Sequence, residues 1–261
     1  MAGIRARDIR KTFRLPGGAQ RLALGGVDLD IADGEFISLL GPSGCGKTTL
    51  LNILSGLEPE YRGRIEFTNG SSEPGTRPRF SYMFQESRLL PWRTVRDNLR
   101  FVLRGTRNGS ADDAIDEWLA RVGLSGSSNL YPAQLSVGMQ QRVSLARALI
   151  VRPEVLFMDE PLSALDELTA TQMRDELLSL WMEQQPTVVF VTHNPLEAVY
   201  LSDRVLIMSP GPGRIIEVLD IKQELPRPRS AEDSRVWELS RECVRVLRGE
   251  GAKGGLAKSP A

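Results

Sequence analysis

Short apolar runs alternate with stretches of helical periodicity along most of this chain, and their order predicts its architecture. Apolar runs with the length of buried strands lie at 35–40, 155–158, 187–191 and 204–208. Apolar residues recur at helical spacing at 48–54, 167–184 and 195–201. Strands that alternate with helices in this way indicate an α/β core.

Additional β-like and helical patterns flank and interrupt this core. Residues 1–40 form short β-like runs with a turn at 16–18, and strands are expected at 63–68 and 80–84, on either side of a Gly/Ser/Pro-rich loop at 69–78. Helical patterns follow at 94–103, 111–122 and 138–150, separated by turn-rich segments at 105–110 and 123–129. We therefore expect one domain over 1–220, with a helical insertion at about 88–151. Residues 221–261 are expected to hold an amphipathic helix at about 236–247 and a disordered tail.

A glycine-rich run between the strand at 35–40 and the helix at 48–54 is the first candidate for chemistry. It consists of Gly41, Pro42, Ser43, Gly44, Cys45, Gly46, Lys47, Thr48 and Thr49, and it fits the P-loop pattern Gly-x4-Gly-Lys-Thr. Glycines allow backbone N–H groups to converge on an anion, and the helix N-terminus adds partial positive charge. In this pattern Lys47 reaches the β- and γ-phosphates of a nucleotide and Thr48 binds Mg²⁺. A glycine-rich turn with a chance lysine is the alternative, which the flanking strand and helix disfavour.

Two adjacent carboxylates end the apolar run at 155–158. Side chains of neighbouring residues in a strand diverge, so Asp159 and Glu160 can do different work. Asp159 is placed to hold the hydration shell of Mg²⁺, as an acid after an apolar strand does in P-loop NTPases. Glu160 is placed to act as general base toward an attacking water. An ordinary acidic turn is the alternative explanation.

Composition narrows the compartment and the partners. Lys+Arg and Asp+Glu balance at 33 each, so no overall basic charge indicates nucleic acid, and we expect no such partner. No apolar stretch approaches the roughly 18 residues of a membrane span, and the start of the chain lacks the apolar segment of a signal peptide. The two cysteines, Cys45 and Cys243, cannot form a disulfide framework and suit a reducing compartment. We therefore expect a cytoplasmic chain that reaches a membrane only through a partner.

A third motif carries a family resemblance. Residues 135–142, Leu-Ser-Val-Gly-Met-Gln-Gln-Arg, precede the strand at 155–158 and open a helix. They resemble the signature motif of the ATP-binding-cassette (ABC) superfamily, and from about residue 4 to 218 the chain is similar to an ABC transporter ATPase subunit. Other family motifs match in order: Gln85 as the Q-loop glutamine, residues 163–166 (Ser-Ala-Leu-Asp) as the D-loop, and His193 as the switch histidine.

This resemblance implies both a fold and a dimeric site. The fold class is α/β, with a P-loop NTPase core of ABC type, an antiparallel β subdomain and an inserted α-helical subdomain. The ligands are ATP and Mg²⁺, with Glu160, His193 and Gln85 in catalysis and Thr48, Gln85 and Asp159 at the metal. Two chains pack head to tail, so that the signature of one completes the phosphate site of the other. The additional residues assigned to the nucleotide are Phe13, stacked on adenine, Ser136, Gly138 and Asp166.

Simpler explanations remain for single residues. Gln85 fits a solvated loop position, Asp166 a helix N-cap, His193 a polar residue at a strand end, and Phe13 a core aromatic. The order and spacing of the motifs favour the functional explanation over these alternatives.

Two positions depart from the family pattern. Val137 stands where the family has the first of two glycines, and a branched side chain resists a positive φ. We expect activity to survive because Ser136 and Gly138 remain. Asn194 follows His193 where the family often has aspartate.

The segments 84–92, 131–136 and 204–214 are similar to importer subunits of the nitrate/sulfonate/taurine group. The resemblance implies two membrane permease subunits and an extracytoplasmic solute-binding protein, with this chain peripheral on the cytoplasmic face of the membrane. Leu-Leu-Pro-Trp at 89–92 suits docking of a permease helix, and a buried core turn is the alternative. The solute contacts the partners, so sulfonate, taurine, nitrate, bicarbonate and vitamin precursors stay open.

Three other function classes fit the sequence less well. A soluble ABC ATPase of DNA repair or translation normally has two cassettes or a long coiled-coil insertion, which this sequence lacks. A P-loop kinase or GTPase leaves 135–142 unexplained, and the guanine motif Asn-Lys-x-Asp is missing. A nucleotide-gated module without catalysis leaves Glu160 idle.

Overall fold

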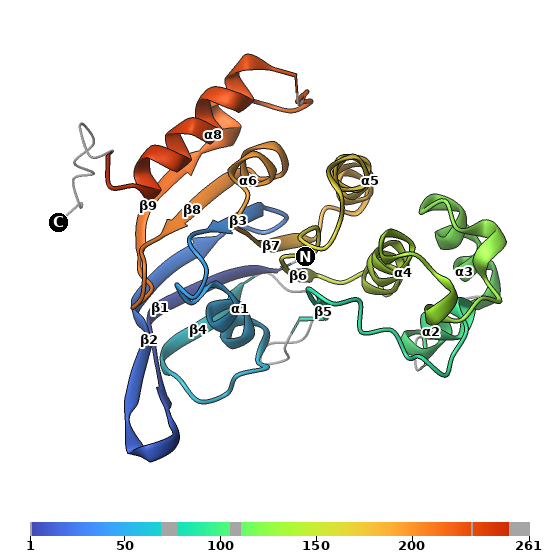
Figure 1. Cartoon of the computed structure of the whole chain (residues 1–261), viewed down its shortest axis with the longest axis horizontal. Coiled ribbons are helices and arrows are strands. Elements are labelled where there is room, and N and C mark those ends of the chain that lie inside the picture. Colours follow the sequence, from blue (N-terminus) through green and yellow to red (C-terminus); the bar gives the residue numbers. More distant parts are fainter. Residues whose placement is uncertain (1, 69–77, 105–110, 231, 251–261) are drawn as a thin grey trace.

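A six-stranded, mostly parallel sheet forms the centre of the molecule in the computed structural model, which describes residues 2–68, 78–104, 111–230 and 232–250 (Figure 1). Its strands are ordered β5-β6-β7-β3-β8-β9. Neighbours run parallel except β9, which is antiparallel to β8. The bounds are β3 (Phe36–Leu40), β5 (Phe80–Met83), β6 (Val155–Asp159), β7 (Thr187–Thr192), β8 (Arg204–Met208) and β9 (Ile215–Asp220).

Both faces of this sheet are covered, which explains the continuous apolar runs in its strands. Along β6, Val155 and Phe157 join the core on one face, while Leu156 and Met158 join the core on the other. The same alternation holds along β7. A strand of this kind has no polar face, so its sequence shows an apolar run instead of a two-residue period.

A second, antiparallel sheet covers one face of the centre. It contains β1 (Gly3–Arg14), β2 (Gln20–Ile31) and β4 (Arg62–Thr68) in the order β2-β1-β4. A short turn at Pro16–Gly18 joins β1 and β2, as predicted. Helix α1 (Lys47–Ser55) packs between the two sheets, where its apolar side chains share one core with both.

The chain between β5 and β6 is helical, and it forms one end of the molecule in Figure 1. Its helices are α2 (Val95–Val102), α3 (Ala111–Arg121) and α4 (Val137–Leu149), and with α5 (Glu167–Gln184) they share a second core. Helix α4 begins one residue before the predicted start because Ser136 caps it, with Oγ accepting the Met139 N–H at 3.2 Å. The predicted α/β class with an antiparallel sheet and a helical insertion is confirmed.

The residues after β7 form a third core around α6 (Pro195–Leu201). This core joins α6 to β8, β9, α7 (Ile221–Glu224) and α8 (Ser234–Leu247). Strand β9 was not predicted, because half of the residues of this edge strand are exposed and it shows no continuous apolar run. The boundary predicted at residue 220 falls at the junction of β9 and α7.

Several predictions concern segments outside the described residues. The predicted disordered tail includes 251–261, and the predicted loops at 69–78 and 105–110 fall almost wholly in the undescribed gaps. Within the described ranges, no helix has the length and apolar character needed to cross a bilayer.

Candidate functional site

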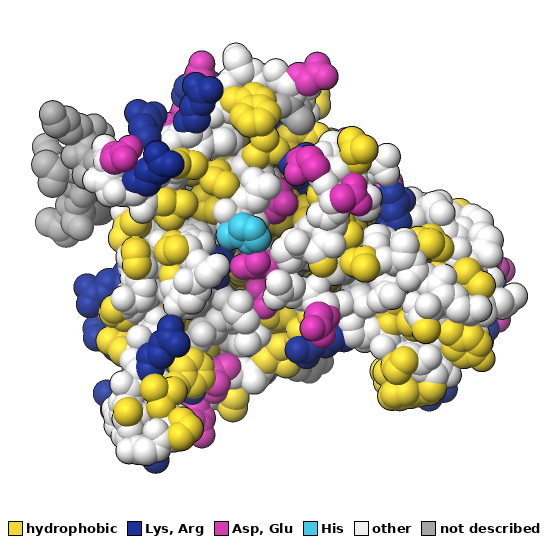
Figure 2. Space-filling model, viewed as in Figure 1, with side chains coloured by type: hydrophobic (Ala, Val, Ile, Leu, Met, Phe, Trp, Pro, Cys, Tyr) yellow, Lys and Arg dark blue, Asp and Glu magenta, His cyan; other side chains and the backbone are white. Residues whose placement is uncertain are grey.

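Three motifs that are far apart in the sequence meet at one edge of the central sheet. Strands β6, β7 and β3 are adjacent and parallel, and residues 41–49, the Asp159–Glu160 pair and His193 follow their carboxyl ends. The register pairs Leu40 with Thr192 and Asp159 with Val191, so these ends are level. The one histidine of the chain lies next to acidic side chains on the face shown in Figure 2. The carboxyl ends of parallel strands are the usual place for ligands in open α/β sheets.

The loop at 41–49 curls tightly in front of α1. Gly44 and Gly46 have φ values of +75° and +106°, which residues with a Cβ rarely adopt. Gly46 also lies against β2, since a Cβ there would come within 2.8 Å of Leu24 Cδ2. The loop leads directly into α1, whose first turn offers unpaired backbone N–H groups. This arrangement fits an anion such as a nucleotide phosphate.

Lys47 supplies the buried charge of this loop. Its side chain is 4% exposed, and Nζ donates to the carbonyl oxygens of Gly41 at 2.8 Å and Pro42 at 3.2 Å. Nζ also lies 3.8 Å from Glu160 Oε1. An ammonium group that is held by the loop it serves needs little rearrangement to receive an anion.

Thr48 and Asp159 form an oxygen pair beside Lys47. Thr48 Oγ1 donates to Asp159 Oδ1 at 2.9 Å, and Asp159 is 8% exposed. Burial raises the pKa of Asp159 above its ordinary value, so a nearby cation would favour its ionised form. No cluster of three His, Cys, Asp or Glu side chains suited to a metal occurs in the described ranges. Mg²⁺ does not need one, because it commonly takes one or two protein oxygens together with substrate phosphates and waters.

Glu160 is held in a strained turn directly after β6. Its φ is +43°, and its main-chain oxygen accepts from the N–H of Ser163 at 3.2 Å and from Ser163 Oγ at 2.9 Å. Its carboxylate has Oε2 3.0 Å from His193 Nδ1. A left-handed conformation in a residue with a side chain costs energy, and such strain clusters at functional sites. Here it accompanies a carboxylate that lies between Lys47 and His193.

Gln85 lies beside this group and is linked to it through Ser163. Gln85 Nε2 donates to Ser163 Oγ at 3.3 Å. Among the hydrogen bonds of the described residues, none joins Gln85 to Thr48 or Asp159, the other two residues assigned to the metal. The structure therefore places Gln85 near the acids without bringing it to the predicted metal ligands.

Residues of α4 hold the segment that follows Gln85, although no sequence motif had identified them as site residues. Gln141 Nε2 donates to the Gln85 carbonyl at 2.7 Å. Arg147 donates to the carbonyls of Ser87 at 2.7 Å and Arg88 at 2.9 Å. A polar residue on the buried face of a helix is the signal that could have pointed to Gln141, which is 2% exposed.

The signature residues are not brought to the loop of their own chain. Ser136 and Gly138 lie at the start of α4, which Figure 1 shows well separated from α1, beyond β6. Ser136 is exposed, and Gly138 packs on α5, since a Cβ on it would lie 2.9 Å from Thr169 Cγ2. Asp166 caps α5, accepting from the N–H of Thr169 at 3.0 Å and from its hydroxyl at 2.7 Å, and these bonds lower its pKa. The helix-cap explanation for Asp166 is therefore correct for the single chain.

Phe13 is not a core aromatic. It is half-buried on β1, belongs to none of the three cores, and has its ring centroid 4.8 Å from Lys11 Nζ. Its partner across the hairpin is Arg21, and a guanidinium nitrogen of Arg21 would lie 3.7 Å from a Cβ on Gly44. The hairpin thus runs beside the loop at 41–49, which leaves Phe13 available for a ligand of that loop.

Val137 does not need the backbone conformation that a glycine would provide. It is the first residue of α4, its φ is not positive, and it is 53% exposed. We therefore expect Val137→Gly to retain or raise ATP turnover and to lower stability by only about 0.3 kcal/mol, the difference in helix propensity between valine and glycine. Steady-state hydrolysis and thermal melting measure the two effects. A large loss of turnover would show that the valine side chain is specifically accommodated.

The second departure from the family pattern has a structural explanation. Asn194 caps α6, with Oδ1 accepting from the N–H groups of Leu196 at 2.9 Å and Glu197 at 3.5 Å. Aspartate offers the same carbonyl-type oxygen to a helix N-terminus. The exchange therefore preserves the cap and leaves the turn at His193 intact.

Comparisons with known proteins agree with this geometry. A sequence profile described as ABC transporter matches residues 24–163. The nitrate import ATP-binding protein NrtD of Synechococcus elongatus is 42% identical over 248 residues, which cover 92% of this chain and 89% of that protein. The aliphatic sulfonates import ATP-binding protein SsuB of Bacillus subtilis is 42% identical over 216 residues, covering 83% and 84%. The bicarbonate transport ATP-binding protein CmpC of S. elongatus is 42% identical over 235 residues, covering 88% of this chain and 35% of that longer protein.

The fold has solved counterparts as well. A dimeric post-hydrolysis state of the ATP-binding cassette MJ0796 bound to ADP and Pi superposes with a TM-score of 0.72 at 30% identity, covering 84% of this chain and 98% of the cassette. A second dimeric structure of MJ0796, titled a bacterial ABC transporter cassette, gives a TM-score of 0.71 over the same shares. The chain belongs to the ABC transporter family, and it is an ATP-hydrolysing subunit of that family.

Proposed function

We propose that this chain is the motor subunit of an importer, in which two copies enclose two ATP molecules and drive uptake of a small solute through partner permeases. The observation that carries the proposal is the separation of the site into two parts. The phosphate loop and the acids are together, whereas the exposed Ser136 lies on a helix away from them. A second copy would bring that helix to the nucleotide, and relatives of this fold occur as dimers.

Within one copy, the loop at 41–49 and Lys47 hold the phosphates of ATP. Thr48 and Asp159 would hold Mg²⁺. Gln85, whose side chain now bonds Ser163, would provide a further oxygen ligand after a change of rotamer. The metal, when bound, neutralises charge that builds on the phosphates. Phe13 stacks on the adenine, with the hairpin already beside the loop.

Glu160 and His193 carry the hydrolytic step. Glu160 accepts the proton of the attacking water, and its separation of 3.0 Å from His193 Nδ1 fixes the orientation of the carboxylate. His193 is 56% exposed, so its outer ring nitrogen can reach the γ-phosphate. Ser136 and Gly138 of the second copy offer a hydroxyl and a backbone N–H at a helix start. Asp166, which is also assigned to the nucleotide, follows the acids in the sequence and caps α5.

A groove beside Gln85 is the candidate docking site for the permease. It has a volume of about 650 Å³ and lies between the segment 85–91 and the start of α4. Of the run 89–92, Leu89 is buried in the helical core, whereas Trp92 is 71% exposed. The core-turn explanation therefore holds for Leu89, and Trp92 provides the exposed apolar surface. Because Gln141 and Arg147 tie this segment to α4, a permease helix in the groove would move together with the signature.

The solute is proposed to be sulfonate-, taurine- or nitrate-like, and it is delivered by an extracytoplasmic binding protein. Relatives named for nitrate, aliphatic sulfonates and bicarbonate support a small oxyanion. The chain would then lie on the cytoplasmic face of the membrane, bound to two permease subunits. A soluble ATPase unconnected to transport is the alternative.

The test is reconstitution of this chain with its cognate permease and binding protein, and the solute retained by the binding protein is identified after purification. Solute-loaded binding protein is expected to raise ATP hydrolysis several-fold. Trp92→Glu should reduce the amount of permease that co-purifies with the chain. Trp237→Glu is the control, because Trp237 is also exposed but lies on α8, and it should leave co-purification unchanged. A rate of ATP hydrolysis that does not change when the permease and the binding protein are added would favour the soluble ATPase.

A further inference from the structure

The carboxyl end of α6 is buried, and the helix cannot satisfy its own last carbonyl groups. The last carbonyls of any helix have no N–H partner within it, and leaving them unpaired inside a protein is costly. The Ala198 carbonyl has partners nearby in the sequence, since it accepts from the N–H of Ser202 at 3.2 Å and also from the Ser202 hydroxyl. The carbonyls from residue 199 to 202 need partners from elsewhere.

Arg229, in the turn between α7 and α8, provides most of these partners. Its Nη1 donates to the carbonyls of Val199 at 2.8 Å, Tyr200 at 3.2 Å and Ser202 at 2.7 Å. Its Nε donates to the Leu225 carbonyl at 2.7 Å, which ties the arginine to its own segment. The residue is 7% exposed, so this is an internal contact between α6 and the C-terminal segment.

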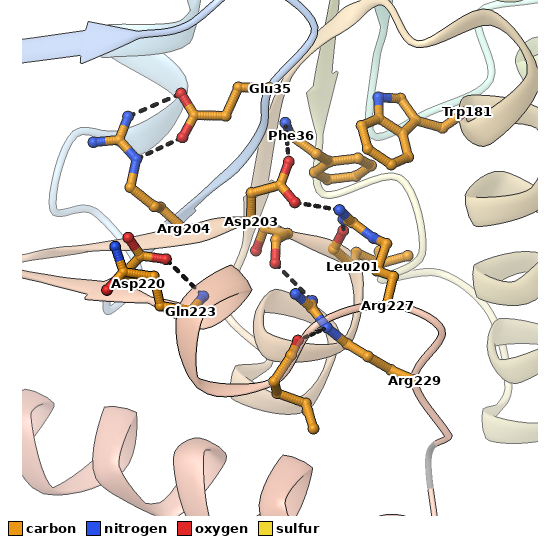
Figure 3. Close-up of polar contacts among 12 residues, drawn as sticks. Glu35, Phe36, Trp181, Leu201, Asp203, Arg204, Asp220, Gln223, Arg227 and Arg229 are labelled. Carbon is orange, nitrogen blue, oxygen red and sulfur yellow. Dashed lines mark hydrogen bonds and ion pairs between the residues drawn. The ribbon is translucent and has the colours of Figure 1, made fainter.

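Arg227 provides the remaining partner. Its guanidinium donates to the Leu201 carbonyl and to Asp203 Oδ1, and it lies over the ring of Trp181 at 4.3 Å (Figure 3). Asp203 in turn accepts from the backbone N–H of Phe36 at 3.0 Å, at the start of β3. Two arginines from one short turn thus account for every carbonyl from 199 to 202.

The buried guanidinium of Arg229 keeps its positive charge at the carboxyl end of α6. Burial lowers the pKa of Arg229 to about 10, which leaves the group protonated at neutral pH. No carboxylate accepts from Arg229 among the described hydrogen bonds, and its partners are carbonyl groups. The carboxyl end of a helix carries partial negative charge, so Arg229 and α6 stabilise one another.

The opposite end of α6 holds His193. Thr192, before it, donates through Oγ1 to Glu197 Oε2 on α6 at 2.6 Å. Asn194, after it, caps α6 through its side chain. His193 therefore lies between two residues that are each bonded to the helix. A shift of α6 would carry His193 away from Glu160, whose oxygen is now 3.0 Å from Nδ1.

We propose that Arg229 is a positioning residue for ATP hydrolysis, which sets His193 against Glu160 by anchoring the far end of α6. The proposal rests on the proposed catalytic function of His193. It assigns the C-terminal segment a part in turnover although that segment contributes no residue to the phosphate site.

The test compares Arg229→Gln with Arg235→Gln in the full chain. Arg235 lies on α8 and pairs with Glu224 and Glu238, and no hydrogen bond or ion pair joins it to α6 among the described residues. Its replacement therefore removes the same charge from the same segment. Arg229→Gln is expected to lower kcat about tenfold or more, because small misplacements of catalytic groups are costly, with less than a twofold change in KM for ATP. Arg235→Gln should match the parent. Arg229→Lys keeps the charge but not the Nε–H bond to Leu225, and it should give an intermediate kcat.

The single histidine of the chain allows a direct spectroscopic measurement. Its imidazole gives one set of ring resonances, which should shift in Arg229→Gln and stay in place in Arg235→Gln. A folded Arg229→Gln with parent kcat and parent resonances would overturn the proposal. If Arg229→Gln does not fold, parent values of both in Arg229→Lys would overturn it equally. Normal turnover in His193→Ala would instead remove the proposed function of His193 itself, so the two failures can be told apart.

Discussion

Replacing Glu160 by glutamine is expected to lower kcat for ATP hydrolysis by about two to four orders of magnitude, the usual contribution of a general base. The amide has nearly the same shape, so the contacts to Lys47 and His193 can be kept in part. It cannot take a proton from water, and only the chemical step should suffer. ATP affinity should change little, because the loop at 41–49 and Lys47 are untouched. With hydrolysis blocked, ATP should hold two copies together.

Single-turnover hydrolysis, nucleotide binding and size-exclusion chromatography with MgATP measure these three effects. Glu217→Gln is the matched control. Glu217 is an exposed acid on β9, the edge strand at the far end of the central sheet from β6. Equal rates for Glu160→Gln and the parent would remove Glu160 from the mechanism and would favour a nucleotide-gated module without catalysis.

Replacing His193 by alanine is expected to reduce turnover by about a hundredfold or more while ATP still binds. The imidazole lies 3.0 Å from Glu160 and is 56% exposed, so it contacts the acid and is accessible for the proposed contact with the γ-phosphate. Alanine removes both contacts at once. Among the described residues, no hydrogen bond or ion pair joins the ring to the loop at 41–49, so we expect nearly unchanged nucleotide affinity.

The neighbouring Asn194→Asp is the control for the turn itself. It preserves the oxygen that caps α6, and turnover within about twofold of the parent is expected. Melting of each variant separates loss of fold from loss of chemistry. Parent-like hydrolysis by a folded His193→Ala would mean that Glu160 is oriented without the histidine.

Local patterns identified most of the fold elements and the motifs. The P-loop and the strand before Asp159 were recognisable because each depends on neighbouring residues, namely glycines in a tight turn and an apolar run buried on both faces. Helices α5 and α6 have the predicted bounds, since their apolar spacing and their N-caps are local features. Strand β9 was missed because half of its residues are exposed and because it is held by pairing with β8.

The contacts that orient the site could not be read in the same way. Lys47 meets Glu160, and Glu160 meets His193, only because β3, β7 and β6 lie side by side in the sheet, and strand order is a property of the folded chain. Arg229 gave no signal in a Pro/Arg-rich segment, since its partners are main-chain carbonyls that every residue possesses.

The amino-acid sequence alone therefore identified the candidate functional groups: a phosphate loop, two adjacent acids, a lone histidine and a signature helix. The tertiary structure decided which of these groups meet. It gathered the loop, the acids and the histidine at one sheet edge, left Ser136 and Gly138 on a separate helix, and anchored α6 from the C-terminal segment. The reason is physical, because a motif depends on neighbouring residues, whereas a distance between motifs depends on how strands pair and helices pack.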